Sequence, residues 1–209
     1  MYYIRFNSFL LGLLVMLFLA CNPQPKAVVV DNEIEDSVVV QEPAPKDAIY
    51  DSLGDLLSEI KINLKANAEQ QKDFVDGNIP WISIAHPQKE IAQLKDPDEV
   101  VISDKKVTLV VDYPLNTPAI LELSSETGFT RKSLIEEISK HYHEIYRIEE
   151  ETATTKTVPI DQRTGLTNRN HTDGKYGIYG HDLVDLELSA IEVYKNKEGK
   201  TILLLVVES

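Results

Sequence analysis

Between Thr130 and Ile148 the apolar residues recur at helical spacing, and this pattern constrains the fold more than any other feature of the chain. At about 100° per residue they share one arc of a helix, and charged residues occupy the opposite arc. Such a helix is stable when its apolar stripe is buried against another element. Thr130 is the expected N-cap, because its hydroxyl can accept a hydrogen bond from a free N–H of the first turn. The apolar arc consists of Leu134, Ile135, Ile138, Tyr142, Ile145 and Tyr146.

A second set of apolar residues with helical spacing lies between Asp47 and Asp76. Polar and charged side chains fill the positions between them, which predicts an amphipathic helix that packs with one face on a sheet. Gly77 and Pro80 are expected to end this helix. Its apolar positions are Ile49, Leu53, Leu56, Leu57, Ile60, Leu64 and Ala68.

Short alternating segments predict the sheet that these helices cover. Residues 107–113 and 119–124 alternate apolar and polar side chains, and residues 81–84 and 100–102 are candidates for further short strands. In 184–193 the apolar phase changes near Ala190, as a β-bulge would cause, and 201–207 is apolar on both faces, as in a central strand. The order of elements predicts an α+β fold: a mostly antiparallel sheet with two amphipathic helices packed on it.

The charge balance excludes one class of partner. The 209 residues include 21 Lys and Arg against 34 Asp and Glu, a formal net charge of -13. Phosphate groups repel such a surface and no basic stripe interrupts it, so nucleic acid is excluded as a general partner. The one cysteine, Cys21, cannot form an internal disulfide or a Cys-based zinc site.

That cysteine ends an uninterrupted apolar run at residues 9–20, which Arg5 precedes. A positive residue followed by a short apolar stretch is typical of an export signal, and the run is shorter than the roughly 17–25 residues that span a bilayer. The ending Leu17-Phe18-Leu19-Ala20-Cys21 resembles the lipobox of bacterial lipoprotein signals. The resemblance implies that Cys21 becomes the first residue of the mature chain and carries acyl chains such as palmitate. Several acyl chains together give a stable membrane anchor.

Three neighbouring positions bear on this resemblance, and two of them depart from the usual pattern. Phe18 and Leu19 stand where the lipobox usually has a leucine and a small residue, and Asn22 follows the cysteine, as in lipoproteins sorted to an outer membrane. The implied location is the bacterial cell envelope, at the outer membrane. Loss of residues 1–20 would remove only Arg5 among the charged side chains. The mature chain would then have 20 Lys and Arg against 34 Asp and Glu, a net charge of -14.

Residues 22–46 combine prolines with acidic side chains, which predicts a flexible tether. As a flexible coil these residues would span ~25–30 Å. Valine triplets at 28–30 and 38–40 could alternatively add an edge strand to a sheet. The expected organisation is therefore a signal peptide at 1–20, a lipidated cysteine and tether at 21–46, and a single α+β domain at 47–209.

A long polar segment, residues 152–180, separates the second helix from the C-terminal hairpin. Loops beyond about 15 residues in a compact domain are usually functional or disordered. Four basic and two acidic residues give this segment a charge of +2 within a strongly acidic chain. A binding surface for a protein or a small acidic ligand is expected here, formed by Arg163, Arg169, Asn170, Tyr176 and Tyr179.

The glycines of this segment do not form a phosphate loop. Gly174, Gly177 and Gly180 lead from a loop into a predicted strand, whereas phosphate loops lead into the N-terminus of a helix. We expect these glycines to permit tight turns.

The histidines offer a second hypothesis, in which the chain is a hydrolase or a metal-dependent enzyme. His141 and His143 point in different directions on one helix and cannot bind the same ion. The weak catalytic candidates are His171, His181, Asp182 and Asp185, whose side chains suit a divalent ion or acid–base chemistry. Their spacing matches no motif with a known mechanism, and a role of His181 and Asp182 in ordering the loop is the plainer alternative. No metal site or cofactor is assigned.

Residues 107–209 also resemble an uncharacterised domain family. The resemblance lies in Gly128-Phe129-Thr130-Arg131, in Ile145-Tyr146 with Glu149-Glu150-Glu151-Thr152, and in residues 174–183 with Asp185-Leu186. It implies that helix, loop and hairpin form one unit, and it transfers no activity. The sequence thus favours a lipid-anchored envelope protein that binds a partner through residues 152–180, with the enzyme as the alternative.

Overall fold

The structure is a computed structural model that describes residues 46–165 and 168–209. The predicted signal peptide, Cys21 and nearly all of the predicted tether lie outside the described residues. Within the described ranges, no helix is both long enough and apolar enough to cross a bilayer.

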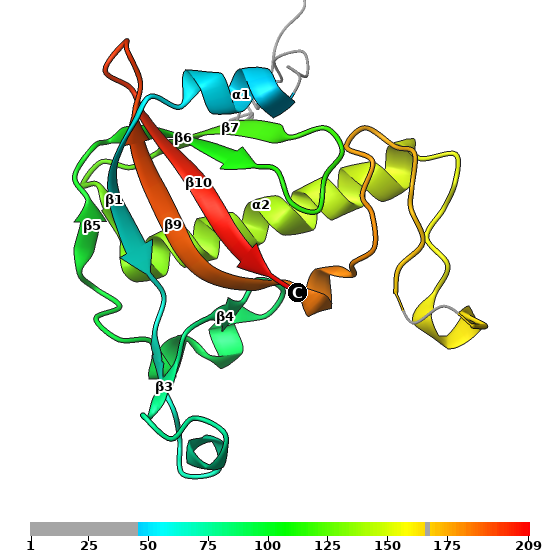
Figure 1. Ribbon diagram of the computed structural model, residues 1–209, viewed down its shortest axis with the longest axis horizontal. Coiled ribbons are helices and arrows are strands. Elements are labelled where there is room, and N and C mark those ends of the chain that lie inside the picture. The colour runs from blue at the N-terminus through cyan, green and yellow to red at the C-terminus, as the bar shows by residue number, and fades with distance from the viewer. Residues whose placement is uncertain (1–45, 166–167) are drawn as a thin grey trace, which may run out of the picture. The chain divides into compact units, whose positions relative to one another are not determined.

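The fold is α+β, as the sequence predicts (Figure 1). Its main sheet has the strand order β1-β9-β10-β6-β7, and β4 pairs with β9. All neighbours are antiparallel except β10 and β6, which run parallel. The strands are β1 (Asp55–Lys61), β4 (Ile82–Ser83), β6 (Lys106–Val111), β7 (Ala119–Ser124), β9 (Glu187–Lys195) and β10 (Thr201–Glu208).

Two small strand pairs flank this sheet. Strand β2 (Leu64–Lys65) pairs with β3 (Asn78–Ile79), and β5 (Val100–Ile102) pairs with β8 (Phe129–Thr130). The short strands expected at 81–84 and 100–102 are therefore present as β4 and β5. The connections include single turns of 3-10 helix at η1 (Gln70–Lys72), η2 (Pro87–Lys89), η3 (Ile91–Gln93), η4 (Ile160–Gln162) and η5 (Leu183–Asp185).

Helix α2 (Arg131–Thr152) covers one face of the sheet and confirms the main prediction. Thr130 is its N-cap: the hydroxyl accepts from Ser133 N at 3.1 Å, and the Ser133 hydroxyl in turn accepts from Thr130 N at 2.9 Å. The apolar arc faces the largest core cluster, together with alternate residues of β6, β7, β9 and β10. The helix ends at Thr152, one turn beyond the predicted end at Ile148.

Helix α1 (Lys46–Ser52) covers part of the opposite face. Ile49 and Leu53 pack there on Val110 and Ile202, which alternate along their strands with residues of the main core. The predicted helix over 47–76 is therefore wrong beyond its first turns, because β1, β2 and the 3-10 turn η1 lie in the remainder.

Gly54 is where the helical periodicity fails. It has a φ of +85°, and a Cβ there would lie 2.2 Å from the carbonyl oxygen of Lys195. Such close approach and positive φ favour glycine and stop the helix, so that β1 can pair with β9. Beyond it the buried residues alternate with a period of two, at Ile60, Ile62, Leu64 and Ala66.

The C-terminal hairpin contains the expected bulge. Val206 pairs with Ala190 while Val207 pairs with Leu188, so one extra residue lies on β9 between them. Strand β10 is central, between β9 and β6, as predicted. The predicted start of β9 at Val184 is wrong, because residues 183–185 form η5 and the Val184 side chain is exposed.

Candidate functional site

The long segment after α2 is ordered around a buried carboxylate. Glu149 is 0% exposed although it lies in the last turn of the helix, where a charged residue is usually solvated. Its Oε1 accepts from Thr172 Oγ1 at 2.6 Å and from Gly174 N at 2.9 Å, and its Oε2 accepts from Tyr176 N at 2.8 Å and Gly177 N at 3.0 Å. The loop thus closes over the helix end through its own backbone N–H groups.

These bonds decide the protonation state of Glu149. Burial raises the pKa of a carboxyl group, and the bonds from Thr172 and from three backbone N–H groups lower it. The bonds prevail, and the pKa of Glu149 lies below its ordinary value. The residue is an ionised structural anchor.

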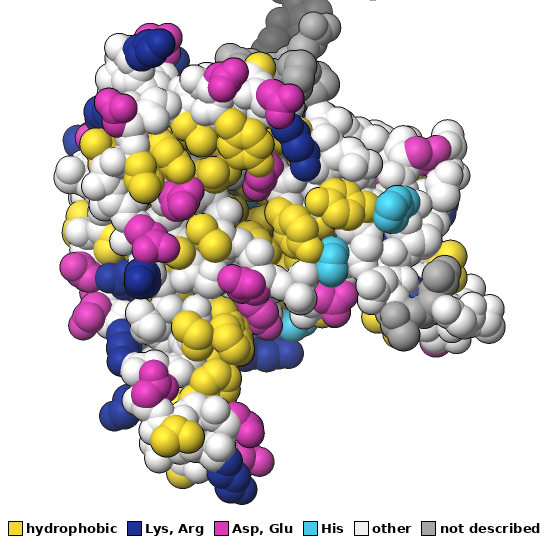
Figure 2. Space-filling view, in the orientation of Figure 1, with side chains coloured by type: hydrophobic (Ala, Val, Ile, Leu, Met, Phe, Trp, Pro, Cys, Tyr) yellow, Lys and Arg dark blue, Asp and Glu magenta, His cyan; other side chains and the backbone are white. Residues whose placement is uncertain are grey.

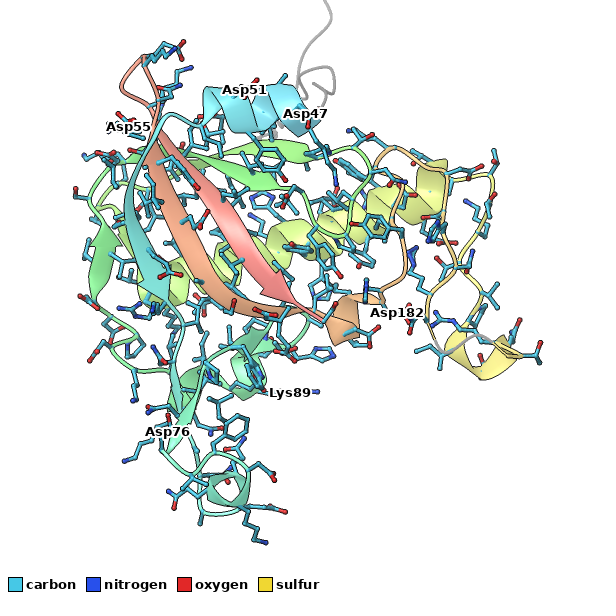
Figure 3. All side chains as sticks on the ribbon, viewed as in Figure 1. Asp47, Asp51, Asp55, Asp76, Lys89 and Asp182 are labelled. Atoms are coloured by element: carbon cyan, nitrogen blue, oxygen red, sulfur yellow. The ribbon has the colours of Figure 1, made fainter. Side chains whose placement is uncertain are left out.

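Two buried arginine side chains, Arg163 and Arg169, stabilise the part of the loop that lies away from Glu149. Arg163 donates from both terminal nitrogens to Asp182, at 2.6 and 2.9 Å, and from Nε to Val158 O at 2.9 Å. Its side chain is 4% exposed. Asp182, labelled in Figure 3, lies at the start of η5, so this ion pair ties the loop to the segment before β9.

Arg169 is buried in the same region. Its side chain is 3% exposed, its Cζ lies 5.3 Å from the Tyr146 ring centroid, and Nη2 bonds to the Thr157 hydroxyl and lies 3.8 Å from Glu150 Oε2. Both arginines that were expected to form a surface for a partner are therefore largely enclosed. The predicted +2 charge of this segment is not presented as an exposed arginine patch.

The aromatic side chains of this region are more accessible. Four rings form a continuous row, which we name the aromatic row: His171, Tyr179, Tyr113 and His181. Successive ring centroids are 5.9, 6.1 and 5.4 Å apart. His171 is exposed and the other three are half-buried. Figure 2 shows yellow apolar side chains crossing this face, with cyan histidines beside them.

Backbone pairing sets the spacing of the row. Tyr113 follows β6, and the chain after it bonds to the loop: Asn116 N donates to Gly177 O at 3.0 Å and Tyr179 N donates to Pro114 O at 3.1 Å. At the other end, the Tyr146 hydroxyl donates to His181 O at 3.0 Å. Elements far apart in the sequence thereby place four rings side by side.

Polar groups border the aromatic row. Lys46 Nζ lies 6.0 Å from the Tyr179 ring centroid, and the Tyr50 hydroxyl donates to Asp112 Oδ2. That hydrogen bond, with a smaller contribution from burial, raises the pKa of Tyr50 to about 12. The first helix therefore contributes a cation and a phenol beside the row.

The residues of the enzyme hypothesis do not form one cluster. His171 and His181 lie at opposite ends of the row, Asp182 pairs with Arg163, and Asp185 accepts from Asp182 N at 3.0 Å. Among residues 46–165 and 168–209, no three His, Cys, Asp or Glu side chains form a group that could hold a metal ion. The loop-ordering alternative fits Asp182 directly. The two histidines of α2 have different neighbours: His141 Nε2 lies 3.8 Å from Glu137 Oε2, and His143 Nε2 hydrogen-bonds with Ala85 O.

Of the other expected binding residues, Asn170 and Tyr176 support the loop, whereas Tyr179 belongs to the aromatic row. Asn170 Oδ1 accepts from Val158 N at 2.8 Å, and Tyr176 is 6% exposed. Sequence reasoning assigned no functional role to Glu149 or Tyr113. The glutamate has a local signal, because it continues the apolar arc of α2 four residues after Ile145.

Gly177 and Gly180 adopt positive φ values of +63° and +77°, which confirms the turn role expected for them. At Gly174 the backbone instead lies too close to Glu149 to leave room for a side chain.

The chain matches no family model, no curated protein and no solved structure. The resemblance of residues 107–209 to an uncharacterised domain family stays a prediction.

Proposed function

We propose that this chain is a lipid-anchored protein of the bacterial cell envelope, held at the outer membrane through Cys21, whose α+β domain binds a protein partner. The anchor rests on the lipobox-like ending at Cys21 and on the proline-containing tether that follows it. The domain itself supports the binding role, because its ordered loop displays an aromatic surface.

The aromatic row is the observation that carries this proposal. Glu149, the Arg163–Asp182 pair and Arg169 are turned inward and hold the backbone, whereas the other charged side chains of residues 152–180, two lysines and two aspartates, are exposed. The tyrosine and histidine rings are left toward solvent on that rigid support. Aromatic side chains are enriched in binding surfaces because they bury much area at low conformational cost.

The orientations of the rings favour an extended peptide as the bound segment. Neighbouring planes are inclined by 68°, 85° and 40°, so no two successive faces are parallel. A strand of flat sugar rings cannot stack on such faces in succession. A peptide can contact tilted rings with its side chains and hydrogen-bond to the Tyr hydroxyls and His nitrogens with its backbone.

The test is an array of random dodecapeptides probed with the purified full-length chain and with four variants. Tyr179→Ala removes the central ring, and Tyr179→Phe keeps the ring without its hydroxyl. His171→Ala removes one end of the row. Ile160→Ala is the matched control, because Ile160 is 66% exposed in the same loop and lies outside the row.

We expect Tyr179→Ala to weaken the selected peptides about tenfold or more, and His171→Ala to weaken them less, because centrally placed aromatic residues dominate binding energies. Tyr179→Phe should retain most of the binding, and Ile160→Ala all of it. Unchanged melting temperatures would show that these losses are not unfolding. The proposal would be overturned if no peptide bound, or if Ile160→Ala mattered as much as Tyr179→Ala.

A further inference from the structure

A depression of about 510 Å³ lies at the other end of the sheet, beside the β9–β10 turn at the upper left of Figure 1. Four lysines from three segments line it: Lys105 and Lys106 at the start of β6, Lys195 at the end of β9, and Lys200 in the turn. Two acidic side chains, Asp104 and Glu122, also line it. This volume is in the range of small-molecule sites.

Of the two acidic groups of this depression, Asp104 forms an ion pair with a lysine, whereas Glu122 has a neutral hydroxyl as its partner and keeps its charge. Asp104 Oδ2 accepts from Lys195 Nζ at 3.1 Å and from the Thr201 hydroxyl, and Glu122 Oε1 accepts from Thr108 Oγ1 at 2.7 Å. These bonds from Thr201 and Lys195 keep the pKa of Asp104 low, so the Lys195–Asp104 pair is neutral as a unit.

Two of the lysines form no ion pair of their own. Among the described residues, the side chains of Lys106 and Lys200 form no hydrogen bond or ion pair, and Lys105 Nζ lies 3.9 Å from Oε2 of the fully exposed Glu126. The turn fixes the backbone of Lys200, because Asn196 Oδ1 accepts from Lys200 N at 2.8 Å. Four lysines against two carboxylates, Asp104 and Glu122, give the lining of the depression a charge of +2 within an acidic chain.

An apolar pocket adjoins this depression and shares Thr108, Glu122 and Lys200 with it. Its volume is about 180 Å³, and α1 forms one wall over the outer face of the sheet. The apolar lining residues are Ile49, Leu53, Val110, Ile120 and Ile202.

We propose that the two adjoining pockets bind an anionic amphiphile, with its phosphate group between Lys106 and Lys200 and the beginning of its alkyl chain in the apolar pocket beside α1. Lysine ammonium groups bind phosphate as point charges, and the apolar wall gains by excluding water from the alkyl group. The same chemistry is offered by a phospholipid of a nearby bilayer and by a free alkyl phosphate.

The test measures acetylation rates of individual lysines by mass spectrometry on the full-length chain in a nonionic detergent. The probes are monohexyl phosphate, inorganic phosphate and hexanol, which separate the charged group from the alkyl chain. Lys72 is the internal control, because it is exposed and lies in η1, away from both pockets. A second arm uses bilayer nanodiscs of phosphatidylcholine with and without phosphatidylglycerol and no added amphiphile.

We expect monohexyl phosphate to protect Lys106 and Lys200 from acetylation at a concentration about tenfold lower than inorganic phosphate requires. Burying two CH₂ groups of the alkyl chain strengthens binding by about this factor. Hexanol should not protect them, and Lys72 should react unchanged. Ile120→Thr should reduce the advantage of the alkyl chain without affecting protection by inorganic phosphate.

Protection in phosphatidylglycerol nanodiscs alone would identify a bilayer lipid as the source of the ligand, whereas protection only by added hexyl phosphate would identify a free amphiphile. Equal protection of Lys72 would show a general counter-ion effect and overturn the proposal. Equal potency of inorganic and hexyl phosphate, or protection by neither, would also overturn it.

Discussion

The backbone of Gly174 lies directly against Glu149: its N–H donates to Glu149 Oε1 at 2.9 Å, and a Cβ at this position would lie 2.6 Å from Glu149 O. The helix end and the loop are therefore fitted to one another through a carboxylate and a residue without a side chain. The loop that carries Tyr179 is held to the helix end by these contacts.

We expect Glu149→Gln to lower the free energy of unfolding by about 2–4 kcal/mol. The amide keeps one acceptor but turns an NH₂ group toward N–H donors that now have no acceptor. Urea denaturation at neutral pH measures the loss. Glu136→Gln is the control. Glu136 is exposed on the same helix, and its Oε1 lies 3.9 Å from Lys132 Nζ. Removing this carboxylate should lower the free energy of unfolding by no more than about 0.5 kcal/mol. Equal effects of both variants would contradict the anchoring role.

Gly174→Ala tests the closure from the loop side. The added Cβ would meet backbone and carboxylate atoms of Glu149 at 2.6 and 2.7 Å, so the loop has to move and the N–H bonds lengthen. We expect a loss of about 2–4 kcal/mol. Gly180→Ala separates backbone strain from steric contact, because Gly180 has a φ of +77° but open space around it. We expect this variant to lower the free energy of unfolding by about 1–2 kcal/mol. Thermal and urea denaturation compare the two, and a smaller effect at Gly174 would refute the close fit.

Local periodicity predicted the parts of the fold that local contacts determine. The buried arc of α2 and the bulge near Ala190 were visible because the side chains repeat with the period of the element, and the Thr130 cap was visible because its hydroxyl suits the first turn. The helix predicted over 47–76 failed where a tertiary contact prevailed. Gly54 fits against Lys195, which is 141 positions away in the chain, and no window of sequence contains that contact.

The candidate site was predictable only in part for the same reason. The long polar segment marked the right region, and Tyr179 and both histidines lie in the aromatic row. Charge composition could not show that Arg163 and Arg169 face inward, because burial depends on partners such as Asp182 and Tyr146. The contribution of Tyr113 depends on backbone pairing between distant segments.

Arg163→Lys should loosen the outer loop without unfolding the sheet. A single ammonium group cannot reproduce the two bonds to Asp182 and the bond to Val158 O. We expect faster cleavage by subtilisin within residues 152–180, mapped by mass spectrometry, and a stability loss of about 1–3 kcal/mol. Arg147→Lys is the matched control, since its pairs with Glu144 and Glu151 lie on an exposed helix face. Cleavage that changes equally in both variants would argue against a special role for Arg163.

Cys21→Ser tests the proposed anchor. Without the thiol no acyl chain can be attached, so the variant expressed in a bacterial host should leave the detergent phase in a Triton X-114 partition, while the wild type enters it. Metabolic labelling with an alkyne palmitate gives a second readout. Ser37→Ala, in the predicted tether, is the control and should partition as the wild type does. Retention of Cys21→Ser in the detergent phase would show that the apolar run itself is the anchor.

The last prediction concerns Glu187, whose buried Oε2 has no hydrogen-bond partner among the described residues. Burial, with a smaller contribution from Glu90, raises its pKa from 4.5 to about 7. Glu208 is its register partner on β10 and adds another acidic group. The folded state therefore binds a proton more tightly than the unfolded chain. The stability that this proton contributes is complete below about pH 4.5 and is lost as the pH rises through 7.

Between pH 5 and pH 8 we therefore expect the wild type to lose about 1–3 kcal/mol relative to Glu187→Gln, which cannot titrate. Urea denaturation at four pH values in this range, at constant ionic strength, measures the difference in slope. Glu136→Gln controls for the removal of an exposed carboxylate and should parallel the wild type throughout. If the curves of the wild type and Glu187→Gln ran parallel, the carboxyl group at position 187 would have to titrate at its ordinary pKa despite its unpartnered oxygen.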